Sequence, residues 1–243
     1  PVIPPIEGLR ALEGLWTNRE ATGAKEVPER LIILGGGPVG VEIGQAFARM
    51  GASVAIAEAE DRVLFNEAER AGELLGEALE AEGIELKLGA KATAAERRGD
   101  GYALSFEDGT ELRGEKLLVA TGRRARTEGL GLESAGIEPD EKGNVEVDER
   151  LRAGDAVWAV GDVTGTMLFT HLGKYQARVA AADILGRETR ADYRAVPSVV
   201  FTDPQVAAVG HTLVSAQEAG LPVIAVDYPT YGVAGSSFYG RKA

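Results

Sequence analysis

A glycine-rich turn between an apolar run and an amphipathic segment constrains this chain more than any other feature of its sequence. The four apolar residues 31–34 lead into residues 35–40, Gly-Gly-Gly-Pro-Val-Gly, whose glycines have the spacing G-x-G-x-x-G. The segment behind the turn repeats apolar side chains at helical spacing, at Val39, Ile43, Phe47 and Met50. The pattern predicts a buried strand, a tight turn, and a helix that buries those four side chains.

Each glycine at this spacing has a separate physical role. Gly35 lets the chain turn sharply, Gly37 lets the backbone approach a phosphate with no Cβ in the way, and Gly40 lets the helix pack close to the strand. The helix N-terminus then offers unpaired N–H groups and the positive end of its dipole to an anion. The turn therefore predicts a dinucleotide site, and a strand-to-helix turn without a ligand is the alternative.

An acidic residue follows the next apolar run at the distance that such a site requires. Glu58 ends the run at residues 54–57, about 20 residues beyond the turn, where a carboxylate can accept hydrogen bonds from ribose hydroxyls. Its neighbours Glu60 and Asp61 add negative charge that would repel a 2′-phosphate, while Arg62 could soften this effect. The sequence therefore predicts a preference for NAD over NADP, unless Glu58 is only a solvated strand end.

Composition argues against several other functions. The 243 residues carry a net charge of −12 without a basic run, so nucleic acid and anionic membranes are poor partners. The chain has no cysteine and only two histidines, His171 and His211, so we expect no disulfide, no metal site and no cysteine nucleophile in it. No apolar run has the length of a membrane span and no signal peptide is recognisable, so we expect a cytoplasmic protein.

The remaining sequence alternates between helical and strand patterns, which predicts an α/β fold with a doubly wound sheet. We expect a helix capped by Asn66 and ended by Gly83, a hairpin around Asp108-Gly109, and a later helix that carries Leu168 on its buried face. Strands are expected at residues 84–88, 102–106, 111–113, 116–120, 156–160 and 223–228, with a polar crossover at residues 123–152.

Four motifs, in this order, resemble the FAD-dependent pyridine nucleotide–disulfide oxidoreductases, the family of dihydrolipoamide dehydrogenase and of glutathione, mycothione and mercuric reductases. They are the glycine turn, Ala-Thr-Gly-Arg at residues 120–123, Ala-Val-Gly-Asp at 159–162, and Val-Pro-Ser-Val-Val-Phe-Thr-Asp-Pro at 196–204. The resemblance covers nearly the whole chain.

The resemblance implies a division into domains. Residues 21–122 would form a Rossmann-like NAD-binding domain, residues 123–190 the second half of an FAD-binding domain, and residues 191–243 the start of an α+β dimerisation domain. Residues 1–20 would be a connector from an FAD-binding half that this sequence lacks.

The resemblance also implies roles for individual residues. The nicotinamide dinucleotide would be bound by Gly35, Gly37, Gly40, Glu58 and Gly122. Gly161 and Asp162 would hold the ribityl chain of FAD. The helix start that faces the flavin would consist of Leu168, Phe169, Thr170 and His171. Glu42 matches a family glutamate that pairs with a flavin-side lysine. From the residues alone, Gly161-Asp162 could be only a turn and helix cap, His171 a surface residue, and Glu42 a solvated acid near a helix start.

Other parts of the family pattern are missing from this sequence. The first dinucleotide fold, the redox pair Cys-x4-Cys and the C-terminal histidine–glutamate pair have no counterpart in it. The family's Arg-x-Pro-Asn reads Arg123-Arg124-Ala125-Arg126. We therefore interpret the chain as a fragment and assign no catalytic residue in it.

The resemblance implies that the full-length parent is a homodimeric flavoprotein oxidoreductase. It would move a hydride between NAD(P)H and FAD, and electrons on to a small-molecule or protein disulfide. Two alternatives stay open. One is a cysteine-free relative such as a transhydrogenase or an NADH oxidase, and the other is a dinucleotide-binding module that by itself turns nothing over.

Overall fold

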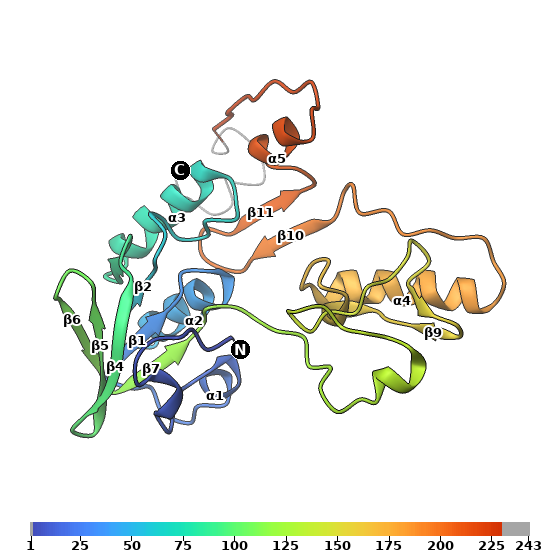
Figure 1. The fold of residues 1–243 in the computed structure, drawn as a ribbon. Coiled ribbons are helices and arrows are strands. Elements are labelled where there is room, and N and C mark those ends of the chain that lie inside the picture. The colour runs from blue at the N-terminus through green and yellow to red at the C-terminus, as the bar shows by residue number, and fades with distance from the viewer. Residues whose placement is uncertain (1, 230–243) are drawn as a thin grey trace. The chain divides into compact units, whose positions relative to one another are not determined.

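A four-stranded parallel sheet of order β3-β2-β1-β7 organises the first half of the chain, in a computed structural model that describes residues 2–229 (Figure 1). Its strands are β1 (Arg30–Leu34), β2 (Ser53–Ala57), β3 (Glu85–Lys87) and β7 (Lys116–Val119). β1 lies at the centre, where Ile32 pairs with Ala55 on one side and with Leu117 on the other. Since both faces of β1 and β2 are covered, these strands are continuous apolar runs. The predicted α/β fold is confirmed.

Helices cover one face of this sheet. α2 (Pro38–Arg49) and α3 (Glu69–Ala81) contribute side chains to a core that includes alternate residues of β1 and β2. This core includes Leu31, Ile33, Phe47, Val54, Ile56, Leu75 and Leu79. Two short elements, η1 (Leu9–Ala11) and α1 (Asn18–Thr22), precede β1, and Trp16 beside α1 packs on Phe47 at a ring distance of 5.6 Å.

The buried face of α2 differs from the predicted one. Gly40, Val41, Gly44 and Phe47 are buried, whereas Met50 is 55 % exposed. The Cβ position of Gly44 lies only 3.0 Å from Ile56 Cδ1, so the glycines let the helix backbone approach the sheet. A prediction based on apolar side chains alone does not count glycine as a buried residue. The predicted buried face is therefore rotated around the helix axis relative to the observed one.

An antiparallel sheet covers the other face. It consists of β4 (Ala92–Arg98), β5 (Gly101–Phe106) and β6 (Glu111–Gly114), in that order. Its inward side chains meet the remaining residues of the parallel strands in a second core, which includes Leu9, Ile32, Leu34, Tyr102, Leu104, Phe106, Leu112 and Leu117. The predicted hairpin around Asp108-Gly109 is confirmed, but β4, which carries four charged or polar side chains among seven residues, was not predicted.

The predicted N-cap of α3 is wrong. The helix begins at Glu69 with Ala68 at its N-cap position, and no side chain caps it. Asn66 instead lies in a turn in which the Glu67 N–H donates to the Leu64 carbonyl at 2.8 Å, and Leu64 has a φ of 52°. The predicted end is confirmed, because Gly83 follows the helix with a φ of 84°.

Residues 123–192 contain short strands and one long helix. The elements are η2 (Leu132–Ala135), β8 (Arg152–Gly154), β9 (Val157–Trp158), η3 (Gly161–Thr164) and α4 (Thr170–Ile184). The strand predicted at 156–160 is thus shorter, and Leu168 precedes α4 rather than lying on its buried face. Leu151, Val179 and Ala180 form the small core of this region.

Asp183 is the buried acid of this region. Its carboxylate accepts hydrogen bonds from Arg152 Nε at 2.6 Å, from Trp158 Nε1 at 3.0 Å and from Arg150 at 3.4 Å. These donors, Arg152 foremost, lower the pKa of Asp183 to about 2 despite its burial. The acid therefore fixes α4 to β8 and β9.

A hairpin follows and lies against α2. β10 (Pro197–Val200) pairs antiparallel with β11 (Val206–Val209). In the loop between them, the Asp203 N–H donates to Gln45 Oε1 and the Asp203 carbonyl accepts from Gln45 Nε2, each at 2.8 Å. Gln45 is buried, so this pair of hydrogen bonds fixes the loop to the middle of α2.

The chain divides into two compact units, residues 1–210 and 211–243. The described part of the second contains α5 (Leu213–Glu218), whose start is capped by the Thr212 side chain. The strand predicted at 223–228 is not formed, and Ile224 is 93 % exposed. Within the described residues no strand pairs with this segment. Residues 230–243 of the predicted dimerisation region lie outside the described residues.

Candidate functional site

The glycine turn joins the carboxyl ends of three strands. Gly35 has a φ of 113°, and its N–H donates to the Ala57 carbonyl at the end of β2 at 2.8 Å. A Cβ at Gly35 would lie 2.7 Å from the Ala120 carbonyl oxygen, just beyond β7. Only glycine meets both conditions, so the turn closes the edge of the sheet where ligands of such folds bind.

The other two glycines of the motif differ in their surroundings. A Cβ at Gly40 would lie 1.9 Å from the Gly35 carbonyl oxygen, which shows how closely α2 packs on the turn. By contrast, nothing lies within 4 Å of the Cβ position of Gly37. Gly37 is also the N-cap residue of α2, and no side chain caps this helix. The turn is therefore packed on the sheet side and open at the helix N-terminus, where an anion could approach.

Glu58 is buried beside the turn. The residue is only 9 % exposed. Its two carboxylate oxygens accept hydrogen bonds from the backbone N–H groups of Gly36 at 2.6 Å and of Glu60 at 3.0 Å. The alternative of a solvated strand end is therefore wrong. Arg62 donates to the Phe65 carbonyl at 2.8 Å and lies 3.4 Å from Asp61. Glu58 thus has backbone donors as its hydrogen-bond partners, and its carboxylate adjoins the glycine turn.

Gly122 lies beside the start of the chain. It has a φ of 127°, and its carbonyl accepts the Val2 N–H at 2.9 Å. The Thr121 hydroxyl donates to the Val2 carbonyl at 2.8 Å. The N-terminal segment therefore runs along residues 121–122, directly beyond β7.

The predicted flavin-side carboxylate lies in a tight turn. Gly161 has a φ of 82° and begins η3, and Asp162 follows it. The Asp162 side chain is 39 % exposed and forms an ion pair with Arg123 at 2.7 Å. Arg123 begins the stretch that departs from the family pattern, so the first arginine of that stretch has a defined partner.

The predicted helix start stands at the N-terminus of α4. Thr170 is the first helical residue, and Phe169 is the N-cap residue without a capping side chain. The His171 ring stacks on Phe169 with centroids 5.2 Å apart, and its Nε2 donates to the Pro197 carbonyl at 2.7 Å. Leu168 and its neighbour Met167 are partly exposed before the helix.

Glu42 has a partner that the sequence did not suggest. Its Oε1 accepts the Phe201 N–H at 2.8 Å, in the loop that Gln45 also holds. The structure therefore assembles the predicted residues in two groups. Gly35, Gly37, Gly40, Glu58 and Gly122 lie at one sheet edge, while Gly161 and Asp162, and the start of α4, form the other group.

The sequence also left two polar residues of the second group unnoticed. Gln176 and Tyr193 form hydrogen bonds beneath the turn that contains Asp162. A glutamine at a helical position that should be buried is the signal that was available for Gln176.

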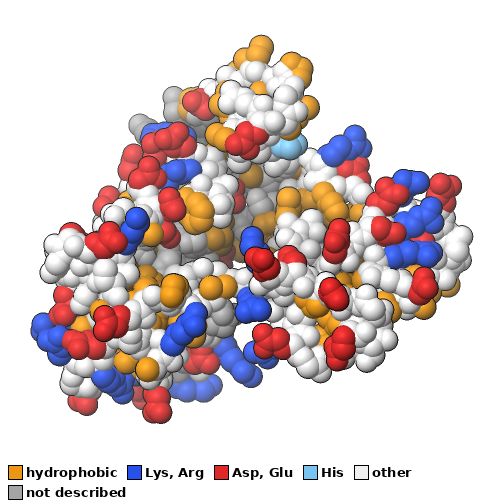
Figure 2. Space-filling view, in the orientation of Figure 1, with side chains coloured by type: hydrophobic (Ala, Val, Ile, Leu, Met, Phe, Trp, Pro, Cys, Tyr) orange, Lys and Arg blue, Asp and Glu red, His pale blue; other side chains and the backbone are white. Residues whose placement is uncertain are grey.

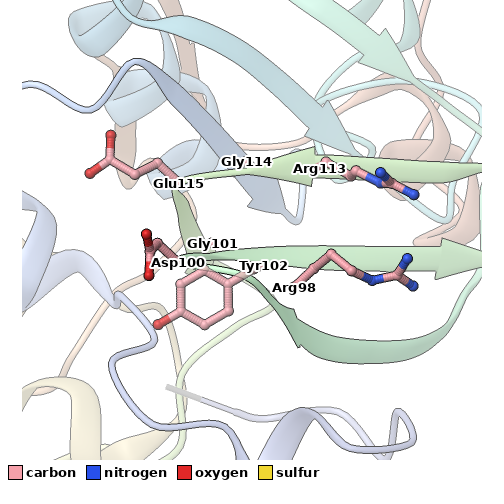
Figure 3. Close-up of a pocket in the computed structure, with 7 residues that line it drawn as sticks. All are labelled: Arg98, Asp100, Gly101, Tyr102, Arg113, Gly114 and Glu115. Carbon is pink, nitrogen blue, oxygen red and sulfur yellow. The ribbon is translucent and has the colours of Figure 1, made fainter.

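A shallow pocket lies away from both groups. It has a volume of about 350 Å³ and is lined by Arg98, Asp100, Gly101, Tyr102, Arg113, Gly114 and Glu115, at the end of the antiparallel sheet (Figure 3). It contains none of the predicted residues, and Arg98 and Arg113 in it pair with Glu96 and Glu111. We assign it no function.

The surface supports a small-molecule site rather than a polyanion site. Figure 2 shows Lys and Arg side chains interspersed with Asp and Glu over the face that it presents. Among residues 2–229, no cluster of His, Asp and Glu has the arrangement to hold a metal ion, and no helix has the length and apolarity to cross a membrane.

The parallel sheet with the glycine turn at its edge is a Rossmann-type fold, the class of fold to which many dinucleotide-binding proteins belong. The chain belongs to the pyridine nucleotide-disulphide oxidoreductase family, whose model matches residues 1–183.

Curated relatives of the chain are oxidoreductases of this family. It is 38 % identical over 232 residues to a dihydrolipoyl dehydrogenase of Thermus scotoductus, covering 93 % of this chain and 50 % of the relative. It is 36 % identical over 222 residues to a mercuric reductase of Acidithiobacillus ferrooxidans, covering 91 % of this chain and 40 % of the relative. The chain thus spans about half the length of the curated relatives that it matches.

Solved structures agree over the whole chain. The HOCl-induced flavoprotein disulfide reductase RclA from Escherichia coli superposes with a TM-score of 0.89 at 32 % identity, covering 100 % of this chain and 56 % of that one. LpdA from Mycobacterium tuberculosis gives a TM-score of 0.87 at 28 % identity, covering 100 % of this chain and 53 % of that one.

Proposed function

We propose that this chain is the nicotinamide-nucleotide-binding part of a flavoprotein oxidoreductase that transfers a hydride between NADH and FAD and passes electrons to a disulfide-type acceptor. The observation that carries the proposal is the glycine turn with Glu58 hydrogen-bonded across it, in a member of this family. The dihydrolipoyl dehydrogenases among the relatives provide a precedent for this chemistry.

The dinucleotide fits the first group of residues. The open Cβ position of Gly37 and the uncapped start of α2 leave room and N–H donors for a pyrophosphate. The Glu58 carboxylate, held by two backbone donors, retains lone pairs to accept ribose hydroxyls. Gly122, at the far end of the same sheet edge, would border the nicotinamide.

NAD is the proposed coenzyme rather than NADP. A 2′-phosphate would meet the Glu58 carboxylate, and Arg62 is engaged with Phe65 and Asp61. Two like charges about 4 Å apart repel by roughly 1–4 kcal/mol at the dielectric of a protein surface or of water.

FAD fits the second group. When bound, FAD supplies the hydride acceptor and passes electrons onward. The partly exposed Asp162 carboxylate would accept hydrogen bonds from ribityl hydroxyls, and the uncapped N-terminus of α4 would offer N–H donors to negative charge. A homodimer, a cytoplasmic location and the domain boundaries at residues 21, 123 and 191 are parts of the same proposal.

Titration calorimetry of the chain with NADH tests the proposal. We expect saturable binding by the wild-type chain. Gly37→Ala should remain folded, because its φ of −73° suits alanine and its Cβ position is empty, yet bind NADH about tenfold more weakly. Gly76→Ala in α3 is the matched control and should bind NADH as the wild type does. Equal affinity of Gly37→Ala and wild type would contradict the phosphate site.

A second candidate function is a flavoprotein that does not use a disulfide, such as a transhydrogenase or an NADH oxidase. These 243 residues contain no cysteine, so they do not decide between the two functions. Thiol counting on the product of the complete reading frame, before and after reduction with NADH, separates the two. Two additional thiols after reduction favour the disulfide reductase.

A further inference from the structure

Gln176 is a fully buried polar side chain on α4, with no exposed surface. Its Oε1 accepts the Gly161 N–H at 2.6 Å. Its Nε2 donates to Thr164 Oγ1 at 3.2 Å and to the Tyr193 hydroxyl at 3.0 Å. A buried amide is tolerated when its hydrogen bonds are made, and here both donors and the oxygen are used.

Two of these bonds reach the two ends of η3. Gln176 binds Gly161 at the first position of the turn and Thr164 at the last, and the Thr164 hydroxyl donates back to the Gly161 carbonyl at 2.9 Å. α4 is also in close contact with the turn at Gly173, where an added Cβ would lie 3.1 Å from the Gly161 Cα. The turn is therefore held on α4 by one side chain and one close backbone approach.

Asp162 lies between the two anchored residues. Gly161 holds a positive φ that other residues rarely adopt, so the direction of the next side chain depends on this turn keeping its shape. Arg123 holds the carboxylate from outside the turn. Gln176 acts from beneath, on the backbone that carries the carboxylate.

We propose that Gln176 is a positioning residue for flavin binding: it fixes the Gly161–Thr164 turn so that the Asp162 carboxylate meets the ribityl hydroxyls. This inference rests on the proposed function, in which Asp162 holds FAD. An apolar residue of the same size would fill the volume but leave the Gly161 N–H without an acceptor.

The test compares Gln176→Met with Gln45→Met. Both variants replace a buried glutamine whose side chain forms hydrogen bonds with backbone groups of a turn. Gln45 bonds the backbone of Asp203, which is not part of the proposed flavin site. In this chain, amide hydrogen exchange at Gly161 reports the turn directly. In the protein from the complete reading frame, the Kd for FAD and the visible circular dichroism of the bound flavin report the site.

We expect Gln176→Met to accelerate exchange at Gly161 and to raise the FAD Kd about tenfold, with an altered flavin dichroism, since the loss of one buried hydrogen bond is of this size. Gln45→Met should leave all three unchanged at a similar loss of thermal stability. An FAD Kd for Gln176→Met within about twofold of wild type overturns the inference.

A further variant separates this inference from the proposed function. If Asp162→Ala weakens FAD binding but Gln176→Met does not, Gln176 is only structural and the proposed role of Asp162 stands. If Asp162→Ala binds FAD as tightly as wild type, both fail. Should Gln176→Met not fold, Tyr193→Phe carries the test by removing one partner of Gln176 Nε2. A Kd about threefold higher supports the inference, and an unchanged Kd overturns it.

Discussion

At the scale of single residues, the two buried acids Glu58 and Asp183 differ in their hydrogen-bond partners. Glu58 accepts hydrogen bonds only from the backbone N–H groups of Gly36 and Glu60 among the described residues, so its carboxylate keeps further lone pairs. Asp183 accepts from two arginines and an indole, which occupy its carboxylate within the protein. In the proposed function the first acid recognises the dinucleotide, whereas the second stabilises the fold.

The coenzyme preference is the first prediction at this scale. We expect the wild-type chain to bind NADH at least about tenfold more tightly than NADPH, because the 2′-phosphate would face Glu58. Glu58→Arg should reverse or abolish that preference by replacing repulsion with a charge-assisted hydrogen bond. Calorimetric titration with both nucleotides measures it, and tighter NADPH binding by the wild type would remove Glu58 from the site.

The second prediction concerns acid stability. Asp183 has a pKa lowered to about 2 from 3.8, so its ion pairs stabilise the fold fully above about pH 4 and lose this contribution as the pH falls towards 2. Asp183→Asn should therefore be less stable than wild type at pH 6, with a difference that shrinks as the pH falls from 4 to 3. Urea unfolding across this range measures it. The exposed Asp100→Asn is the control and should show no such trend.

At the scale of elements, glycines decide how closely the helices approach the sheet. The Cβ position of Gly40 in α2 lies 1.9 Å from the backbone of the turn, whereas that of Gly76 in α3 meets only Leu86 Cδ1, at 3.6 Å. Alanine substitutions at these two helical glycines should therefore change the stability of the fold in opposite directions.

We expect Gly40→Ala to destabilise the chain by about 2–4 kcal/mol, because the turn must move away from the helix. Gly76→Ala should stabilise it by about 0.5–1 kcal/mol through the higher helix propensity of alanine. Thermal unfolding of the two variants beside wild type provides the comparison. Equal stabilities of the two alanine variants would show that α2 can shift without cost.

The same elements show what the sequence could and could not predict. The apolar runs at residues 31–34 and 54–57 and the glycine turn were sufficient for the central strands, since their pattern is local. β4 was not predicted, because only one of its seven residues is buried and its own sequence has no strand pattern. It is a strand because it pairs with β5. The segment 223–228 failed for the opposite reason, since an apolar run without a pairing strand stays irregular.

The candidate site divides in the same way. The glycines and Glu58 follow from spacing along the chain, but the contacts of Asp162 with Arg123 and of Gln176 with Gly161 join residues that only the fold brings together. Glu42 shows the limit most clearly, because its partner Phe201 lies far along the chain.

At the scale of the whole molecule, the chain spans about half the length of the curated relatives that it matches. The flavin site proposed above consists, within the described residues, of one carboxylate and one helix N-terminus. We expect the purified 243-residue chain to be nearly colourless while still binding NADH. An absorption spectrum with stoichiometric flavin would contradict this, and the NADH titration is the control for correct folding.

The position of β7 in the sheet has a consequence for how the protein folds during its synthesis on the ribosome. β1 gains one neighbour from the nearby β2, but its other neighbour is β7, which begins only at Lys116. While the intervening residues emerge, the central strand presents a bare apolar edge, the kind of edge that pairs with foreign strands. A nascent chain stalled before β7 has emerged from the ribosome should therefore aggregate or recruit chaperones, and one stalled after β7 has emerged should already resist proteolysis.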